Sequence, residues 1–572
     1  MRNGLLEKAD IAVLIPLVFL STVLAFPELS DPLIEDEGWF FVNVRYLDTN
    51  GYPRGIHPPL YTFFVYAVSA AIGSTEPVIT RASTFLFTLG TIFPVYFSTK
   101  LIVRENLVEI AETFPKSVAP ALSSLLYILS PLAVQTGVLI DMENVFTFLL
   151  SAFFFWFLYA YELDETTPIV KYAITASFVY VLSWNKFGPL PPLLLTFCCY
   201  FGITRRWSEM TRFAFSVVGG FVAFVITWGG LSLFTGTRFL TPFVTDAQFV
   251  SRVTYPELHA LPLKILNIIY YEILWISPFL LLLCLVVIFP RLEDLRGVRN
   301  THFTQVLQTE QAVLLPFVLF SLLTIVEYGV LLKGSTYDFT KYMGRVMPLL
   351  TIAAGVGMGR VKIRPTKRWS AQVAGGSLVV AGVIFALADP IAGAWSAPGR
   401  RLLIYSGLLV PIAIVWGAST VLLNQHDSTT KRAIVTSILL VAVLGSNVGL
   451  VAMQATASYS TRYYYGTSGT GDAIDYVGSE IACNESATVG GPYGMRHQLQ
   501  NTYTEDAERL FTVRSKGDVV ASRSDIVVVL SRSYYFPSGQ QVLELGNYTK
   551  LTQFGDYSLF VRSSYQICRR PT

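Results

Sequence analysis

Apolar segments recur along this chain at the length of about 20 residues that a bilayer crossing requires. Thirteen such segments are present, spread from the N-terminus to residue 454. They lie at 11–27, 80–100, 118–138, 142–161, 168–185, 188–204, 212–234, 268–290, 312–332, 342–360, 370–389, 402–423 and 432–454. The sequence therefore predicts an all-α polytopic membrane protein with about 13 transmembrane helices.

Composition supports a membrane protein. Only 14% of the 572 residues are charged and 52% are hydrophobic, whereas a soluble domain carries about 25% charged residues. This excludes a soluble enzyme and a disordered chain. A net charge of +3 is too small to indicate nucleic-acid binding. Five cysteines are too few for disulfides to stabilise a fold of this size. We expect a lipid bilayer as a partner and no nucleic acid.

The apolar segment 58–73 decides the topology. It is short for a crossing and begins with two prolines. If it does not cross and the N-terminus is cytoplasmic, almost all clusters of Lys and Arg between spans face the cytoplasm, as the positive-inside rule requires. If it crosses, those clusters lie outside. We therefore interpret 58–73 as an interfacial helix on the outer face of a multi-pass cell-membrane protein, with only Arg400 and Arg401 fitting badly.

The residues after the last span predict a second domain. We divide the chain into a transmembrane domain, 1–454, and a small domain, 455–572. Within the latter, 525–530 and 557–562 have the composition of strands, and 470–482 that of a helix. The sequence thus predicts a small C-terminal α/β domain.

Two features agree with the extracytoplasmic position that the topology gives this domain. The N-x-S/T sequons at Asn484 and Asn547 are the only ones in the chain. Cys483 and Cys568 could form a disulfide in an oxidising compartment. Whether the sequons are used stays open, because such triplets also occur by chance.

Acidic residues are concentrated in the first outer loop, 28–57. Glu35, Asp36 and Glu37 follow the first span closely, and His57 precedes the proline-started interfacial segment. A solvated acidic loop is the plain interpretation. The alternative is a catalytic loop at headgroup depth.

Two more carboxylates lie between the spans 118–138 and 142–161. Asp141 and Glu143 occupy a link so short that both are expected at the outer membrane surface. Carboxylates near lipid have a desolvation cost and often a function. Asp141 could instead cap the following helix, as Asp often does.

Cations are predicted at the same depth. Arg81 starts one span, and Lys186 lies in a tight outer link. Lys341 and Arg345 are four residues apart and share a helical face, with Tyr337 one turn earlier. Each cation alone could extend to lipid phosphates. Together with the carboxylates, they suit a lipid-linked phosphate: cations hold the anionic leaving group while a carboxylate activates the acceptor.

Other site chemistries lack their motifs in this sequence. There is no G-x-x-x-x-G-K-[ST] phosphate loop and no G-x-S-x-G nucleophile motif, and the five histidines show no metal-ligand spacing. The glycine run 355–359 lies within a span and predicts close helix packing. Without a nucleotide site, a lipid carrier is the natural source of a phosphate-linked substrate.

The residues in this order resemble a known family. Asp36-Glu37, then His57-Pro58-Pro59-Leu60 and Arg81, then 140–148 (IDMENVFTF), resemble glycosyltransferases of the GT-C fold. Most similar are the dolichyl-phosphate-mannose protein mannosyltransferases and the lipid A aminoarabinose transferases. The resemblance covers residues 1 to about 200 and the later spans in outline.

The resemblance implies an enzyme with an outward-facing site and a polyprenyl- or dolichyl-phosphate sugar donor. It implies inversion at the anomeric carbon, with Asp36 as the catalytic carboxylate, Asp141 beside it and Glu37 available to orient Asp36 or the acceptor. We expect substrate contacts from His57, Arg81, Glu143, Lys186, Tyr337, Lys341 and Arg345.

This sequence departs from the family pattern, so the acceptor stays open between a protein, a glycan and a lipid. Glu143-Asn144 stand where the aminoarabinose enzymes have Pro-Leu. No cofactor is certain, although Asp36, Asp141 and Glu143 could hold a divalent metal. The alternatives are an oligosaccharide ligase or oligosaccharyltransferase of the same fold, and a secondary transporter, which would show internal repeats or ionisable residues at mid-bilayer.

Overall fold

The computed structural model describes most of both predicted domains. The described residues are 7–30, 35–51, 57–108, 110–244, 277, 279–281, 283–284, 312–327, 342–361, 363, 365–386, 428–456, 470–492, 495–496, 499–500, 503, 507–513, 515–530, 538–555 and 557–568. Of the predicted spans, 402–423 lies wholly and 268–290 almost wholly outside these residues.

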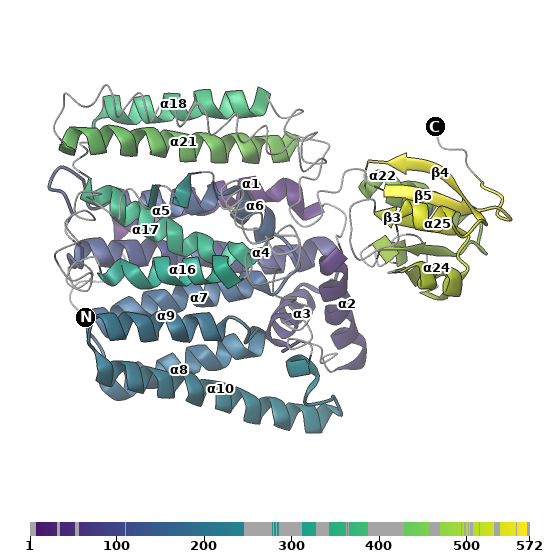
Figure 1. Ribbon diagram of the computed structural model, residues 1–572, viewed down its shortest axis with the longest axis horizontal. Coiled ribbons are helices and arrows are strands. Elements are labelled where there is room, and N and C mark those ends of the chain that lie inside the picture. Colours follow the sequence, from purple (N-terminus) through teal and green to yellow (C-terminus); the bar gives the residue numbers. More distant parts are fainter. Residues whose placement is uncertain are drawn as a thin grey trace, which may run out of the picture.

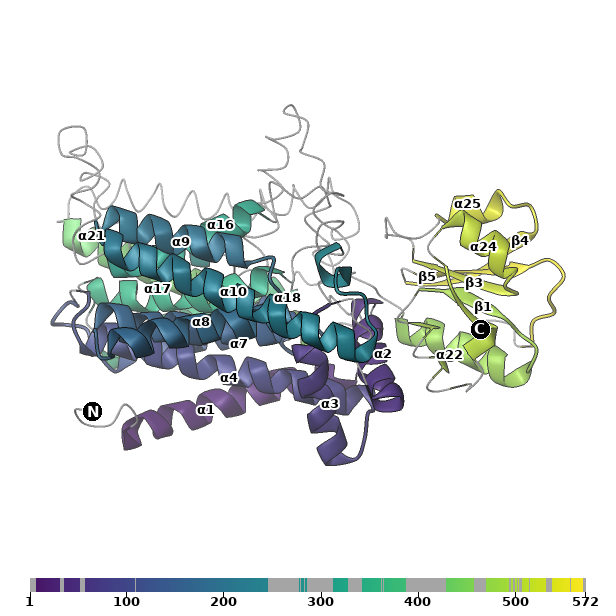
Figure 2. The same ribbon diagram turned by 90° about the horizontal axis from the view of Figure 1, so that it is seen from below.

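Long apolar helices lie side by side and form most of the molecule (Figures 1 and 2). Among the described residues, six helices are long and apolar enough to cross a bilayer, and four shorter apolar helices accompany them. The prediction of a polytopic, mostly helical membrane protein is confirmed. The long helices are α1 (Lys8–Ala25), α4 (Pro77–Arg104), α7 (Glu143–Phe157, extended by a π-helical turn to Glu162), α10 (Trp207–Thr235), α18 (Lys367–Ala386) and α21 (Ser428–Thr456).

The remaining helices of the bundle also follow the predicted spans. The span expected at 168–185 coincides with α8 (Pro168–Asn185), and Pro168 occupies the first turn, where its missing N–H costs no hydrogen bond. The others are α5 (Val118–Ile128), α9 (Leu190–Ile203), α16 (Leu315–Val326) and α17 (Met347–Arg360).

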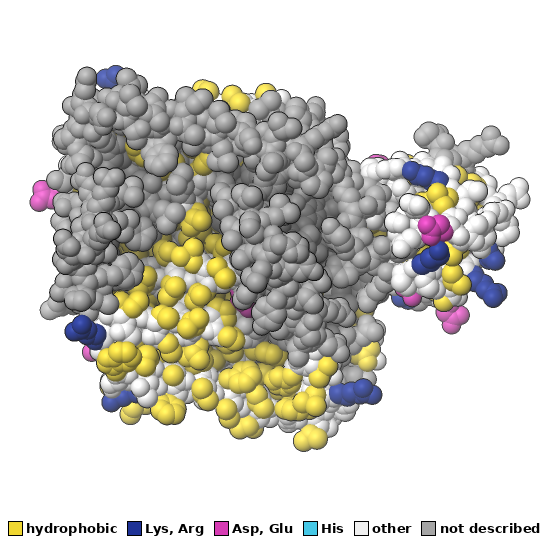
Figure 3. All heavy atoms as spheres, viewed as in Figure 1, with side chains coloured by type: hydrophobic (Ala, Val, Ile, Leu, Met, Phe, Trp, Pro, Cys, Tyr) yellow, Lys and Arg dark blue, Asp and Glu magenta, His cyan; other side chains and the backbone are white. Residues whose placement is uncertain are grey.

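Apolar side chains on the outside of the bundle require a lipid environment. On α10, Phe215, Ile226, Leu233 and Phe234 are between 68% and 89% exposed. Figure 3 shows hydrophobic side chains covering this side of the bundle. A soluble protein rarely exposes so broad an apolar surface, so this face is the one that contacts lipid tails.

The centre of the bundle is packed with phenylalanine. Phe153 and Phe157 on α7 lie 5.5 and 4.6 Å, between ring centroids, from Phe197 on α9, and all three are fully buried. Their spacing along α7 places them on one helical face. Edge-to-face and tilted ring pairs of this kind each contribute about 0.5–1.5 kcal/mol beyond their buried area.

Small residues allow close helix contacts, as the glycine run predicted. A Cβ atom on Gly355 of α17 would lie 1.9 Å from the Ser123 hydroxyl of α5. On α21, a Cβ on Gly445 or Gly449 would lie within 3.0 Å of α18 backbone oxygens. Close approach through small residues is a common way of packing helices in membranes, where apolar burial gives little advantage.

The span predicted at 118–138 is broken, which corrects the expectation of one continuous helix. The helix α5 ends at Ile128, and α6 (Pro131–Gly137) begins after Ser130. Pro131 cannot donate the backbone hydrogen bond that a continuous helix needs. The Ser130 hydroxyl instead caps α6 by accepting from the Ala133 amide at 3.4 Å.

The acidic outer loop, 28–57, contains a helix that the sequence did not predict. This helix, α2 (Glu35–Asn50), lies with α3 (Leu60–Ile72) across the end of the bundle nearest the sheet domain (Figures 1 and 2). Phe40, Phe41 and Val44 form its buried face against α3 and the start of α7. A loop was expected because the charged residues of this segment indicate exposure to water, although an apolar stripe lies between them.

The C-terminal domain is a five-stranded sheet with helices on both faces, which confirms the predicted α/β class. Its strand order is β2-β1-β3-β5-β4; β1 pairs parallel with β2 and β3, and β5 pairs antiparallel with β3 and β4. The strands are β1 (Val489–Gly491), β2 (Leu510–Thr512), β3 (Ile526–Leu530), β4 (Tyr548–Phe554) and β5 (Tyr557–Arg562), and the helices include α22 (Thr470–Cys483), α24 (Lys516–Ser522) and α25 (Gly539–Leu543).

The two strands and the helix expected from the sequence are β3, β5 and α22. Every residue of β3 is buried, as expected for a central strand that is covered on both faces. The exact division into 1–454 and 455–572 stays a prediction, because 457–469 lies outside the described residues.

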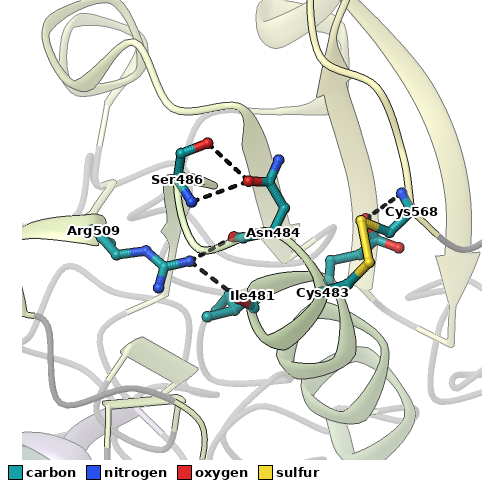
Figure 4. The surroundings of a disulfide bond; sticks show 7 residues. Ile481, Cys483, Asn484, Ser486, Arg509 and Cys568 are labelled. Atoms are coloured by element: carbon teal, nitrogen blue, oxygen red, sulfur yellow. Dashed lines mark hydrogen bonds between the residues drawn. A yellow bond between two sulfur atoms is a disulfide. The ribbon is translucent and has the colours of Figure 1, made fainter.

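Cys483 and Cys568, whose pairing the sequence left open, form a disulfide (Figure 4). It ties the end of α22 to the segment that follows β5. Beside it, the Arg509 guanidinium donates to the carbonyl oxygens of Ile481 and Asn484, at 3.2 and 2.8 Å. These hydrogen bonds supply partners for carbonyl groups at the C-terminal end of α22. The bond fixes the segment after β5 to α22, and the cation fixes the end of α22 to the residues before β2.

Candidate active site

A buried ion pair connects α2 to α4 at the end of the bundle. The Arg81 guanidinium donates through Nε and Nη2 to the two oxygens of Glu37, at 2.9 and 2.6 Å, and the side chains are 0% and 2% exposed. Arg81 also donates to the Leu29 carbonyl at 3.2 Å. The Glu37 carboxylate accepts from the Ile140 amide at 3.1 Å. This pair therefore holds together three segments far apart in the sequence.

A second buried cluster joins Glu143, Lys186 and Arg345. Lys186 Nζ lies 2.8 Å from Glu143 Oε1, and Arg345 Nη2 donates to Glu143 Oε2. The carboxylate thus bridges two cations, one from the α8–α9 link and one from the turn before α17. The sequence analysis expected these three side chains at one depth, and the structure brings them into contact.

Aromatic rings surround the two cations. Lys186 Nζ lies 4.2 Å from the Tyr342 ring centroid, and the Arg345 guanidinium lies 4.7 Å from that of Phe146. Cations over ring faces gain electrostatic attraction, and more so where water is excluded. Both cations therefore have an aromatic ring face beside them in addition to the Glu143 carboxylate.

Asp141 lies between these two clusters on a turn that several hydrogen bonds fix. Its Oδ1 accepts from the Glu143 amide at 3.0 Å, so Asp141 bonds the first N–H of α7 from the position before the N-cap residue, Met142. The side chain of Asn144 donates to the carbonyls of Thr136 and Leu139, and that of Asn185 to the carbonyl of Met142. Asp141 is only 3% exposed, so its carboxylate is held in a rigid, water-poor position.

Tyr61 of α3 lies close enough to Asp141 and Glu37 to interact electrostatically with both carboxylates. Its hydroxyl hydrogen-bonds to Thr84 at 2.7 Å. Burial, together with the charges of Asp141 and Glu37, raises the pKa of Tyr61 well above its usual range. The phenol therefore keeps its proton at neutral pH. His57 stacks at 6.3 Å on Phe40, which contacts the Tyr61 ring edge-on, so His57 lies at the rim of the same region.

Some predicted residues cannot be placed in this geometry. Tyr337 and Lys341 lie outside the described residues, as does the side chain of Asp36, although its backbone belongs to the first turn of α2 beside Glu37. Among the described side chains, no group of three His, Cys, Asp or Glu is placed to hold a metal ion.

The structure adds residues to the site that the sequence analysis missed. Tyr61, Asn185 and Tyr342 contact or support the predicted groups, and Glu327 at the end of α16 interacts electrostatically with Lys186 and Arg345. Two of these had a usable signal, because Asn185 precedes Lys186 directly and Tyr342 lies three residues before Arg345. Tyr61 had none, whereas Glu327 is distinguished in the sequence as a carboxylate inside the predicted span 312–332.

Comparisons with known proteins identify the fold. No protein-family model matches the chain, and no curated protein matches it. A crystal structure of ArnT from Cupriavidus metallidurans bound to undecaprenyl phosphate matches with a TM-score of 0.55 and 14% identity, covering 97% of this chain and 98% of that one. The chain has the fold of ArnT.

Two further structures were matched. The apo state of the same ArnT gives a TM-score of 0.53 at 15% identity, again covering 97% of this chain and 98% of that one. The archaeal oligosaccharyltransferase AglB from Archaeoglobus fulgidus, in complex with an inhibitory peptide and a dolichol-phosphate, gives 0.49 at 11% identity, covering 98% and 75%. The two ArnT matches confirm the fold that the resemblance implied over nearly the whole chain, including spans that the motifs did not reach.

Proposed function

We propose that this protein is a membrane glycosyltransferase that moves a sugar from a polyprenyl-phosphate carrier to an acceptor hydroxyl at the outer face of the membrane. The observation that carries the proposal is the buried pair of cations, Lys186 and Arg345, beside the fixed carboxylate of Asp141. Such a pair suits the phosphate of a carrier lipid, and the matched ArnT was crystallised with undecaprenyl phosphate.

The proposed chemistry needs an anion site and a base. Phosphate is a good leaving group once cations hold its charge, so no general acid is needed. The acceptor hydroxyl becomes acidic as the new bond forms, and a carboxylate on the opposite side of the sugar then takes its proton. This geometry inverts the anomeric carbon. We assign the role of base to Asp36, which belongs to the first turn of α2. Asp141 is the alternative.

The other residues receive supporting roles in this proposal. Glu37 and Arg81 fix α2, and therefore Asp36, relative to Asp141. Lys341 and Tyr337 precede Arg345 closely in sequence and would extend the phosphate site, and His57 would contact the substrate from the rim. A hexose such as mannose on a dolichyl-type carrier is our choice of donor, and a protein, a glycan or a lipid remains the acceptor class.

The positions of the buried charges favour an enzyme over a transporter. In the described part of the bundle, the buried ionisable side chains lie at helix ends or in links, as Arg81, Glu143 and Lys186 do. A secondary transporter places its substrate and ion sites near the bilayer midplane. Surface chemistry on a lipid headgroup is the function that this distribution suits.

The test is donor cleavage by the purified full-length protein in lipid nanodiscs. Polyprenyl-phosphate hexoses with a radiolabelled sugar are supplied together with candidate acceptors, and label leaving the lipid fraction is measured. We expect label transfer from at least one donor. Retention of label on every donor, with the protein folded, would refute the proposal.

A matched pair of variants links that activity to the cation site. Lys186→Met removes a buried cation at the proposed site, and Lys171→Met removes one that bonds Asp164 in the α7–α8 link. Loss of one charge-assisted contact of about 1.5–3 kcal/mol should weaken donor binding roughly tenfold or more in the first variant only. Equal effects in both variants would mean that general destabilisation, and not phosphate binding, explains the loss.

A further inference from the structure

The two cations proposed to hold the donor's phosphate already hold an anion from the protein itself. Glu143 directs one carboxylate oxygen to Lys186 and the other to Arg345, as a phosphate would direct two of its oxygens. We propose that Glu143 occupies the position that the lipid phosphate takes, and that lipid phosphate must displace it. This inference rests on the proposed function, and it assigns Glu143 a competing role in place of the supporting substrate contact expected from the sequence.

The geometry allows the Glu143 side chain to leave without disturbing the fold. Glu143 is the first residue of α7, and its amide is held by Asp141 Oδ1. The turn before it is fixed separately, through the side chains of Asn144 and Asn185. Rotation of the Glu143 side chain therefore needs no movement of the helix, and the N-terminus of α7 still favours a nearby carboxylate.

Charge gives this competition a consequence for product release. The donor is a phosphodiester with one negative charge, whereas the product, polyprenyl phosphate, is a monoester that carries about −1.5 to −2. Glu143 bonds both Lys186 and Arg345 and, once displaced, stays close to the bound phosphate. Its charge repels the doubly charged product more than the singly charged donor. Glu143 should therefore weaken product retention and speed its release.

The opposite hypothesis makes the opposite prediction. If Glu143 only orients the two cations, removing its charge should disorganise the site and weaken phosphate binding. If it competes with phosphate, removing its charge should strengthen binding. Glu143→Gln keeps the size of the side chain and separates these outcomes by the sign of the effect.

Glu327 offers a matched control. It interacts electrostatically with Lys186, Arg345 and Glu143, but among the described residues neither of its oxygens forms an ion pair with a cation, and its buried Oε2 has no hydrogen-bond partner. Glu327→Gln therefore removes an acidic group from the same region without emptying the phosphate position. A general electrostatic effect would be shared by both variants.

The experiment measures equilibrium binding of undecaprenyl phosphate, with undecaprenol as the uncharged probe, to the full-length protein in nanodiscs. We expect Glu143→Gln to bind the phosphate about tenfold or more tightly than the wild type. Glu327→Gln should change binding much less, and undecaprenol binding should not change. Glu143→Asp, which keeps the charge on a shorter side chain, should show a smaller gain and serves if Glu143→Gln does not fold.

Three results would overturn the inference. Equal or weaker phosphate binding by the folded Glu143 variants would make Glu143 a support for the cations. An equal gain in phosphate affinity in Glu327→Gln would mean that the loss of a nearby acidic group, and not the position of Glu143, explains the effect. Failure of the wild type to bind undecaprenyl phosphate, with or without a sugar, would instead remove the proposed function on which the inference rests, so the two failures are distinguishable.

Discussion

Replacing Arg81 by Gln tests whether the first buried ion pair positions the site or binds substrate. The change removes two charge-assisted hydrogen bonds to Glu37, each worth about 1.5–3 kcal/mol. It also leaves the Glu37 carboxylate buried without its cation, and breaking a buried pair in this way costs about 3–5 kcal/mol. The two estimates agree, so we expect the free energy of unfolding to fall by about that amount.

A second substitution identifies the cause. Adding Glu37→Gln to Arg81→Gln removes the unpaired charge and keeps an oxygen that can accept from the Ile140 amide. The double variant should therefore be more stable than Arg81→Gln alone. Lys171→Gln is the control, since its partner Asp164 is 77% exposed and stays hydrated when the lysine is lost, so the cost should be much smaller.

The assay combines unfolding in mixed detergent micelles with donor binding. If Arg81 positions α2, Arg81→Gln should lose turnover but keep its affinity for the lipid phosphate, because Lys186 and Arg345 are unchanged. An Arg81→Gln protein as stable as the wild type would contradict the energetic reasoning. A stable variant with weakened donor binding would return Arg81 to the substrate-contact role that the sequence suggested.

Three further predictions concern catalysis, topology and the sheet domain. Asp36→Asn should lower turnover about 10²–10⁴-fold, as expected for a general base, with donor binding intact; near-normal turnover alongside an inactive Asp141→Asn would move the base to Asp141. Cysteines introduced at Ser74 and Ser370 should be labelled by an impermeant reagent from outside and inside respectively; external labelling at Ser370 would reverse the assignment of later spans. Reduction of the disulfide should cost the sheet domain about 2–5 kcal/mol of stability, seen as earlier proteolysis of that domain than of the bundle.

The bundle could be predicted because a membrane span has one dominant requirement, a long apolar segment. The helices α8 and α18 begin and end within a few residues of the segments expected at 168–185 and 370–389. Pro131 in the sequence indicates the break between α5 and α6. The break was missed because spans were identified from the length of apolar segments, which a proline does not interrupt. Helix α2 was missed because its buried stripe lies between charges that suggested a solvated loop.

Sequence position could group three candidate site residues, but it could not predict which of them pair. Depth along the helix axis follows from position relative to span ends, so Glu143, Lys186 and Arg345 could be assigned to one surface. Which carboxylate meets which cation depends on how helices distant in sequence pack around each other. Nothing in the sequence indicated that Arg81 pairs with Glu37, or that Glu143 contacts both Lys186 and Arg345.

The two ion clusters differ in a way that follows from what each must do. Arg81 has its full set of contacts within the protein, with a bidentate carboxylate and a carbonyl, and it is completely buried. That arrangement suits a permanent link, because any departure would leave charges unpaired in a medium that cannot solvate them. Lys186 and Arg345 instead bond the two oxygens of the Glu143 side chain, at the very start of α7. A site that binds and releases a phosphate needs cations of this kind, whose internal anion can leave when the phosphate binds and return when it departs.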